Sequence, residues 1–312
     1  MTSTSKEMLS EESGVVFYLF IGIFVLLINV PLILVIFIHK KTRSQSDLIL
    51  LGGLCVADTL MAACFLMAGI YREFETSEDG QLLVQWKCFL KPHTLGFYTA
   101  YQMTAVMTLI VTMDRVIVVF FPGLYIKFCT VHHRLYLVLL GVFIFCFVSL
   151  TAAAAFQMTQ TDLIPDFCYL INTLHINVWR YLLGFRIITI GFSVVLLVPI
   201  MVKVRAIVAR CQQSAKMYRA TVTIGLTSLS ALFCLLIPDL LMVLDSEGFK
   251  TYHITFYVIG LSKSLINTFI YVLRQEDLQK IILKFLGKLF GCKIPRRDIS
   301  VVGVADKVKT SA

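Results

Sequence analysis

The stretch TMDRVIVVFFPGLY, residues 112–125, sets an acid beside an arginine at the end of a long apolar run. A full charge is costly inside a lipid bilayer, but a long side chain at the end of a membrane helix can extend its charged head into water. The pair Asp114–Arg115 therefore indicates the point at which a membrane-spanning helix ends. If this is right, the rest of the chain must consist mainly of such helices.

The composition of the chain is that of a membrane protein. Of its 312 residues, 58% are hydrophobic and only 15% are charged, whereas soluble domains carry roughly 25% charged residues. The net charge of +9 would suggest nucleic-acid binding on a soluble chain, but on a membrane chain the basic residues gather in cytoplasmic loops. We therefore expect the lipid bilayer, and no nucleic acid, as a partner.

Seven apolar runs are long enough to cross the hydrocarbon, which takes about 20 residues in a helix. The expected spans are Val15–Ile38, Leu48–Ile70, His93–Phe120, Leu135–Phe156, Val178–Val202, Ala220–Leu244 and Tyr252–Leu273. The sequence shows no internal repeat and no separate domain. We expect an all-α membrane protein in which residues 15–274 form one seven-transmembrane helix bundle and residues 1–14 form a short extracellular tail.

The charges between the spans alternate in sign along the chain. Basic residues follow spans one, three and five, and acidic residues follow spans two, four and six. The basic set is Lys40, Lys41, Arg43, Lys127, Arg134, Lys203, Arg205, Arg210, Lys216 and Arg219, and the acidic set is Glu73, Glu75, Glu78, Asp79, Asp162, Asp166, Asp245 and Glu247. Because cytoplasmic loops collect Lys and Arg, we expect a multi-pass plasma-membrane protein with its N-terminus outside and its C-terminus inside.

Residues 275–291, beyond the last span, have an amphipathic pattern. Apolar residues recur at helical spacing, and lysines such as Lys280 and Lys284 occupy another face. This pattern predicts a short amphipathic helix on the anionic cytoplasmic leaflet. Cys292 follows it and is either a palmitoylation site or an unmodified thiol. Residues 292–312 form the expected cytoplasmic tail.

Motifs for catalysis and metal binding are missing from the sequence. It contains no G-x-x-x-x-G-K-[ST], no G-x-S-x-G and no H-E-x-x-H pattern. Its 9 cysteines form no C-x-x-C pair and no cluster with histidine, which is the spacing that zinc sites use. We therefore expect no enzyme activity, no cofactor and no metal.

Single residues on five of the spans fall in a recognisable order. They are Asn29; Leu54, Ala57 and Asp58; Asp114, Arg115, Pro122 and Tyr125; Pro238; and Asn267 and Tyr271. With these residues the chain resembles the rhodopsin-like G-protein-coupled receptors over nearly its whole length. It departs from them at Val116, Leu236 and Thr268, where the family usually has tyrosine, tryptophan and proline. In its departures it is most similar to nematode serpentine chemoreceptors of the srsx class.

The resemblance implies that Arg115 is a switch for G-protein coupling. In the family this arginine is restrained at rest, here by Asp114, and it turns toward the G protein when span six swings outward about a proline, here Pro238. A plain charge pair that anchors the end of the helix is the alternative. The other residues that the resemblance assigns to the switch are Pro122, Tyr125, Asn267 and Tyr271.

Asp58 lies in the middle of span two, where an unpaired carboxylate is costly. The resemblance implies a sodium site around it, with Thr104 and Ser264 in matching places, and Asn29 of span one is expected in the same internal polar cluster. Lys263, however, replaces an asparagine that is usual in the family. We expect Lys263 to pair with Asp58 and to take the place of the ion; alternatively, it faces another polar group or water inside the bundle.

The resemblance also implies a disulfide between Cys88 and Cys168, the two cysteines in the expected outer loops. This bond would tie the loop after span four over the ligand entrance, in an oxidising compartment. Cys88 lies two residues further from Arg115 than is usual in the family. A bulge or a shifted helix start can absorb that difference.

The expected ligand pocket combines aromatic and ionisable groups. Arg186 and Asp239 are ionisable residues in apolar spans, which makes them functional candidates, and they contact either a ligand or each other. Aromatic walls with a few hydrogen-bonding groups suit small ligands. The candidates for these walls are Phe97, Tyr98, Tyr101 and Gln102.

Two ligand classes are disfavoured by the resemblance. The retinal-binding lysine of opsins would stand at Leu261, and Lys263 lies about 200° further around the helix. The aspartate of the amine receptors is replaced by Phe97.

The function that we expect is activation of a heterotrimeric G protein by a small extracellular ligand, as in chemosensation. A receptor for a short peptide is the alternative within the same family. The short tail of residues 1–14 and the lack of an N-x-[ST] sequon argue against a large folded hormone-binding domain. From other classes, a ligand-gated channel or transporter, or a seven-helix protein that does not signal, remains an alternative.

Overall fold

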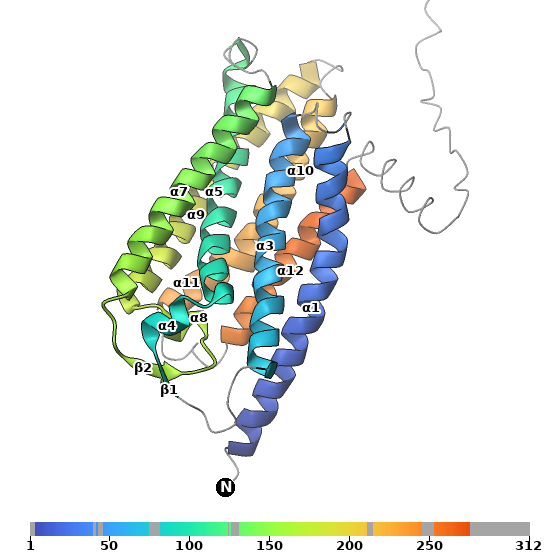
Figure 1. The fold of residues 1–312 in the computed structure, drawn as a ribbon. Helices are drawn as coiled ribbons and strands as arrows, with labels where there is room; N and C mark the ends of the chain where they lie inside the picture. The colour runs from blue at the N-terminus through green and yellow to red at the C-terminus, as the bar shows by residue number, and fades with distance from the viewer. Residues whose placement is uncertain are drawn as a thin grey trace, which may run out of the picture.

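Seven long helices run side by side in the computed structural model (Figure 1). The residues that the structure describes are 4–39, 42, 46–74, 82–123, 125, 131–210, 215–244 and 253–274. The sixth of these helices is built from three consecutive segments. The bounds are α1 Thr4–Ile38, α3 Ser46–Phe74, α5 Pro92–Phe120, α7 Val131–Gln157, α9 Ile176–Arg210, α10 Ala215–Ala231 with η2 Leu232–Leu236 and α11 Ile237–Leu244, and α12 His253–Arg274.

All seven helices are apolar and long enough to cross a membrane, so the all-α seven-span architecture predicted from the sequence is confirmed. Several helices extend beyond the apolar runs. α1 begins at Thr4, inside the expected tail, because lysine, glutamate, methionine and leucine in this segment all favour helix. The predicted amphipathic helix at 275–291, and Cys292 with the tail, lie outside the described residues.

The helix α3 occupies the middle of the bundle, between α1 and α5 (Figure 1). Its contact with α1 is close: a Cβ on Gly22 would lie 3.1 Å from the carbonyl oxygen of Ala62 and 3.1 Å from the amide nitrogen of Leu66. Small residues allow membrane helices to approach in this way. α5 continues the layer and also packs against α7 and α9. Large apolar side chains such as Phe20 and Phe143 stay exposed on the outside of the bundle, where lipid covers them.

The sixth span changes its winding just before its proline. Between α10 and α11, the segment η2 is a π-helix, in which the amide of Ile237 donates to the carbonyl of Leu232. Pro238 follows directly, and a proline inside a helix lacks an amide proton and clashes with the carbonyl four residues earlier. A π-turn widens the helix where such a clash occurs. The irregularity expected at Pro238 is therefore a wide turn over Leu232–Leu236, which ends two residues before the proline.

Short elements cover one end of the bundle. The strands β1 (Leu82–Val84) and β2 (Leu163–Pro165) pair antiparallel, and the short helices α4 (Gln85–Phe89) and α8 (Leu170–Thr173) follow them. A disulfide joins Cys88 to Cys168, as the sequence predicts. It ties α4, which directly precedes α5, to the loop after α7. Figure 1 places this cover at the same end of the bundle as the N-terminus.

Candidate functional site

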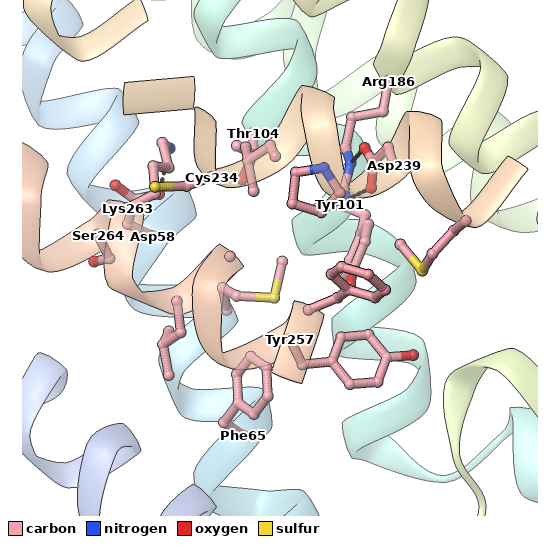
Figure 2. Close-up of a pocket in the computed structure, with 17 residues that line it drawn as sticks. Asp58, Phe65, Tyr101, Thr104, Arg186, Cys234, Asp239, Tyr257, Lys263 and Ser264 are labelled. Atoms are coloured by element: carbon pink, nitrogen blue, oxygen red, sulfur yellow. Dashed lines mark hydrogen bonds and ion pairs between the residues drawn. The ribbon is translucent and has the colours of Figure 1, made fainter. Parts of the chain in front are cut away.

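A small cavity lies in the centre of the bundle, between α3, α5, α9, the sixth span and α12 (Figure 2). Its volume is about 30 Å³, and a buried water needs roughly 10–15 Å³ by this measure. Ionisable and aromatic side chains face it together. They include Asp58, Tyr101, Arg186, Asp239, Tyr257 and Lys263.

One border of the cavity is an ion pair between α3 and α12. The Nζ of Lys263 lies 2.7 Å from Oδ1 of Asp58, and both side chains are almost completely buried. The other oxygen of this carboxylate accepts a hydrogen bond of 3.2 Å from the Nδ2 of Asn267. Both oxygens are thus engaged by nitrogen donors, and Lys263 stands where a cation would have to bind. These residues therefore do not fit a sodium ion.

The polar cluster around Asp58 extends to α1 and α10. Asn267 accepts a hydrogen bond of 2.7 Å from the hydroxyl of Ser230. Asn29 donates to the hydroxyl of Ser264 at 2.9 Å, and its side-chain oxygen accepts from Thr268. Four helices are therefore joined through hydrogen bonds in a region with little water, where each unpaired polar group would be costly.

The members of this cluster differ in whether the sequence predicts them. Asn29 and Ser264 are predicted members. Ser230 and Thr268 are not, although Thr268 stands where the family usually has proline, and that departure is a signal for a new polar contact. The predicted member Thr104 is buried and lines the cavity. Within the described residues, its side chain makes no hydrogen bond to the cluster.

The opposite border of the cavity is a second ion pair, between α9 and α11. The guanidinium of Arg186 donates through Nε and Nη2 to the two carboxylate oxygens of Asp239. Arg186 is 4% exposed and Asp239 is 0% exposed. The Cζ of Arg186 also lies 4.0 Å from the centre of the Tyr101 ring, a cation–π contact. The sequence left open whether Arg186 and Asp239 contact a ligand or each other. In the structure they contact each other.

Aromatic rings complete the wall between the two ion pairs. Phe65 and Tyr257 face the cavity (Figure 2), and their ring centres are 6.2 Å apart. Phe97 stands edge-on to Phe65, with centres 4.9 Å apart, and thus lies one layer behind the wall. Sequence reasoning missed Phe65 and Tyr257, because apolar and aromatic residues are common in every span and give no signal of their own.

Two of the predicted pocket residues point elsewhere. The hydroxyl of Tyr98 lies 2.8 Å from the hydroxyl of Ser149 on α7, and Gln102 donates to the same serine at 2.8 Å. Phe97, Tyr101 and Thr104 follow each other at helical spacing on the inner face of α5. Tyr98 and Gln102 are one turn apart on the adjacent face, about 100° away. They link α5 to α7 and do not line the central cavity.

The charge pair at the other end of α5 is covered by protein. An Nη of Arg115 donates to Asp114 at 2.5 Å, and Arg115 is 2% exposed. The side chain of Arg115 therefore does not extend into water as expected. At this end of the bundle α9 packs against α5. The contact between these ends is made by Val119, Ile200 and Val204.

The remaining residues of the predicted switch are spread over this half of the bundle. Tyr271 is buried in the same apolar cluster as Leu54 and Met107. Pro122 is exposed just after the end of α5, and Tyr125, partly buried, follows it. Pro238 lies near the central cavity, which it helps to line. The structure therefore brings Pro238 to the cavity and Asn267 to the polar cluster beside it, and leaves the other switch residues away from both.

A second, smaller cavity lies on the far side of Lys263. Its volume is about 10 Å³, close to that of one water. Lys263 and Asn267 line it together with Thr108 and Val111 of α5. Lys263 lines both cavities and therefore stands between the central cavity and the part of α5 that leads to Arg115. Among the described residues, no three His, Cys, Asp or Glu side chains are grouped as metal ligands.

The comparison with known families agrees with this architecture. The family described as "Serpentine type 7TM GPCR chemoreceptor Srsx" matches residues 19–286. The chain belongs to this family and is a seven-transmembrane chemoreceptor. Comparison with curated proteins gave no match.

Proposed function

We propose that this chemoreceptor binds a small extracellular ligand in the central cavity and activates a heterotrimeric G protein at the Asp114–Arg115 end of the bundle. The N-terminus and the disulfide-linked cover are then outside the cell, as the loop charges indicate. The observation that carries the proposal is the position of Lys263, which borders the central cavity and also the smaller cavity toward Arg115.

The sixth span is the element that can transmit the signal. Asp239 on α11 faces the central cavity, whereas Ser230 on α10 is bonded to Asn267 in the polar cluster. The π-helix η2 lies between them. A wide turn with poorer hydrogen-bond geometry is a natural hinge. A ligand that moves Asp239 would pivot α10 at this point, and Arg115 would leave Asp114 for the G protein.

We also propose that Lys263 takes the place of a sodium ion beside Asp58. The lysine supplies the positive charge that the buried carboxylate requires, and it does so through a covalently attached group. The support is the engagement of both Asp58 oxygens by Lys263 and Asn267. The receptor should then respond equally to its ligand in sodium and in N-methylglucamine buffers.

The test of the proposed function is a signalling assay with Arg115→Ala. Cells that express the receptor with a promiscuous Gα subunit are screened with volatile and water-soluble metabolites, and intracellular calcium is recorded. We expect Arg115→Ala to abolish the calcium response while the amount of receptor at the cell surface stays unchanged. Arg180→Ala, at an exposed arginine of α9, is the matched control and should signal normally.

Two results, one from this assay and one from a recording of membrane current, would contradict the proposal. Full signalling by Arg115→Ala would show that Arg115 is not the switch for G-protein coupling. A ligand-evoked current that persists when G proteins are blocked would instead assign the chain to the ligand-gated channels.

A further inference from the structure

The ion pair Arg186–Asp239 has three properties that together point to the chemistry of the ligand. It lies on the wall of the central cavity, it joins two helices, and both of its side chains are buried. Charged residues in membrane spans are costly and are therefore usually functional. A wall of neutral apolar residues would bind a neutral ligand equally well. The presence of the pair therefore indicates a ligand with charged groups that bind to Arg186 and Asp239.

The charges around the cavity sum to zero. Arg186 and Lys263 are the cations, and Asp239 and Asp58 are the anions. A ligand with one net charge would engage one partner of a pair and would leave the other buried without compensation, which is strongly unfavourable. A ligand that opens an ion pair in this cavity must therefore bring both a positive and a negative group.

The two ion pairs differ in how readily a ligand could separate the partners and bind to each of them. Asp58 is also bonded to Asn267, which is bonded to Ser230, so that pair is part of a network between helices. Both oxygens of Asp239 are bonded to Arg186 alone, in the part of the chain that the structure describes. Arg186 additionally lies on Tyr101, which can hold the guanidinium in place while its partner changes. Figure 2 shows the pair beside the aromatic residues of the cavity.

We propose that the central cavity binds a compact zwitterion of the α-amino-acid type, with an apolar or aromatic side chain. The carboxylate of the ligand accepts hydrogen bonds from Arg186, in the bidentate geometry that guanidinium favours. Its ammonium group binds Asp239. This inference rests on the proposed function, because it names the ligand class of the same cavity.

The walls of the cavity fit the rest of such a ligand. Phe65 and Tyr257 provide an aromatic surface on the wall of the cavity. The present volume of about 30 Å³ is smaller than an amino acid, so side chains have to move. Met61 and Met242 line the cavity, and methionine side chains adapt easily to new contacts. Insertion between Arg186 and Asp239 would separate α9 from α11, which is the displacement of the sixth span that the proposed function requires.

The experiment measures binding without a G protein. The full-length receptor in lipid nanodiscs is heated with L-phenylalanine, L-leucine, 3-phenylpropanoate or phenethylamine, and the midpoint of unfolding is recorded against ligand concentration. We expect at least one of the two amino acids to stabilise the wild type. The two analogues with a single charge should bind at least about a hundredfold more weakly, because each leaves one buried charge unpaired.

Variants that lack one of the two charges should prefer an analogue with a single charge over the zwitterion. Asp239→Asn leaves Arg186 positive, so this variant should bind 3-phenylpropanoate more tightly than L-phenylalanine. Arg186→Gln leaves Asp239 negative and should favour phenethylamine. The double variant Arg186→Gln/Asp239→Asn carries neither charge, so it folds without an unpaired charge and should lose the preference for zwitterions. Arg180→Gln on the same helix is the matched control and should behave as wild type.

The proposal is overturned if neither amino acid stabilises the wild type, or if an analogue with a single charge stabilises it equally well. These results do not depend on coupling to a G protein. A receptor that binds L-phenylalanine but fails the calcium assay would contradict the proposed function alone. A receptor that signals to other metabolites through Arg115 and ignores both amino acids would contradict the zwitterion alone.

Discussion

At the scale of single residues, the four charged side chains that line the central cavity form two ion pairs. Lys263 pairs with Asp58 and Arg186 pairs with Asp239, on opposite borders of one cavity, and each pair joins two helices. Breaking such a pair by removing one partner costs about 3–5 kcal/mol, whereas replacing both partners can be nearly neutral. We therefore expect the pairs to specify which helices meet more than they add to stability.

A double-mutant cycle on Lys263 and Asp58 follows from this pairing. Lys263→Met and Asp58→Asn should each lower the free energy of unfolding by about 3–5 kcal/mol, because each leaves one buried charge without its partner. The double variant should lose much less than the sum of the two. Thermal unfolding of the purified receptor measures all three. Lys87→Met, at an exposed lysine, is the control, and additive losses in the cycle would contradict a direct pair.

At the scale of the elements, close helix contacts depend on residues without a side chain. Gly22 sits where α1 meets α3, and a Cβ there would lie within 3.1 Å of backbone atoms. Backbone cannot move aside as a flexible side chain can. By contrast, a Cβ on Gly141 of α7 would meet no atom within 4 Å.

Gly22→Val should therefore destabilise the bundle by about 1–3 kcal/mol, the usual cost of overpacking. The branched side chain would push α1 away from α3. Gly141→Val, the same substitution on an open face, should stay within about 0.5 kcal/mol of the wild type. Thermal unfolding and surface expression of both variants, compared in parallel, give the answer. Equal losses for the two would mean that helix propensity, and not the contact with α3, decides the effect.

The faces of the helices explain which of the predicted pocket residues line the central cavity. On α5, the residues at one helical spacing line the cavity or its second layer, namely Phe97, Tyr101 and Thr104. Tyr98 and Gln102 have similar chemistry but turn toward Ser149 on α7. The identity of a residue is visible in the sequence, but the rotation of its helix depends on which neighbours it packs against.

At the scale of the whole molecule, the disulfide fixes the cover over one end of the bundle. Cys88 and Cys168 are separated by 80 residues in the sequence, and β1 pairs with β2 beside them. The hydroxyl of Tyr71 on α3 also donates to the carbonyl of Asp166 at 3.1 Å. These contacts connect α3, the segment before α5 and the loop after α7 at the end of the bundle that carries the N-terminus.

Removal of the bond should lower stability by about 2–4 kcal/mol, because the unfolded chain regains the freedom of a long closed loop. Cys88→Ser, Cys168→Ser and the double variant should have the same effect, since any one of them removes the whole bond. Dithiothreitol should lower the unfolding midpoint of the wild type and leave that of the double variant unchanged. Cys146→Ser, at a free cysteine, is the control. A reductant-insensitive wild type would contradict a structural role for this disulfide.

The sequence by itself determined the seven spans and the disulfide partners. Span length and hydropathy are local properties, and the resemblance to a family rests on the order of a few residues along the chain. The tertiary structure alone decided that Arg186 meets Asp239, that Thr268 and Ser230 join the polar cluster, and that a π-helix precedes Pro238. Each of these depends on how far every helix is rotated about its axis. That rotation is set by packing against the neighbouring helices, which sequence periodicity in a uniformly apolar span does not reveal.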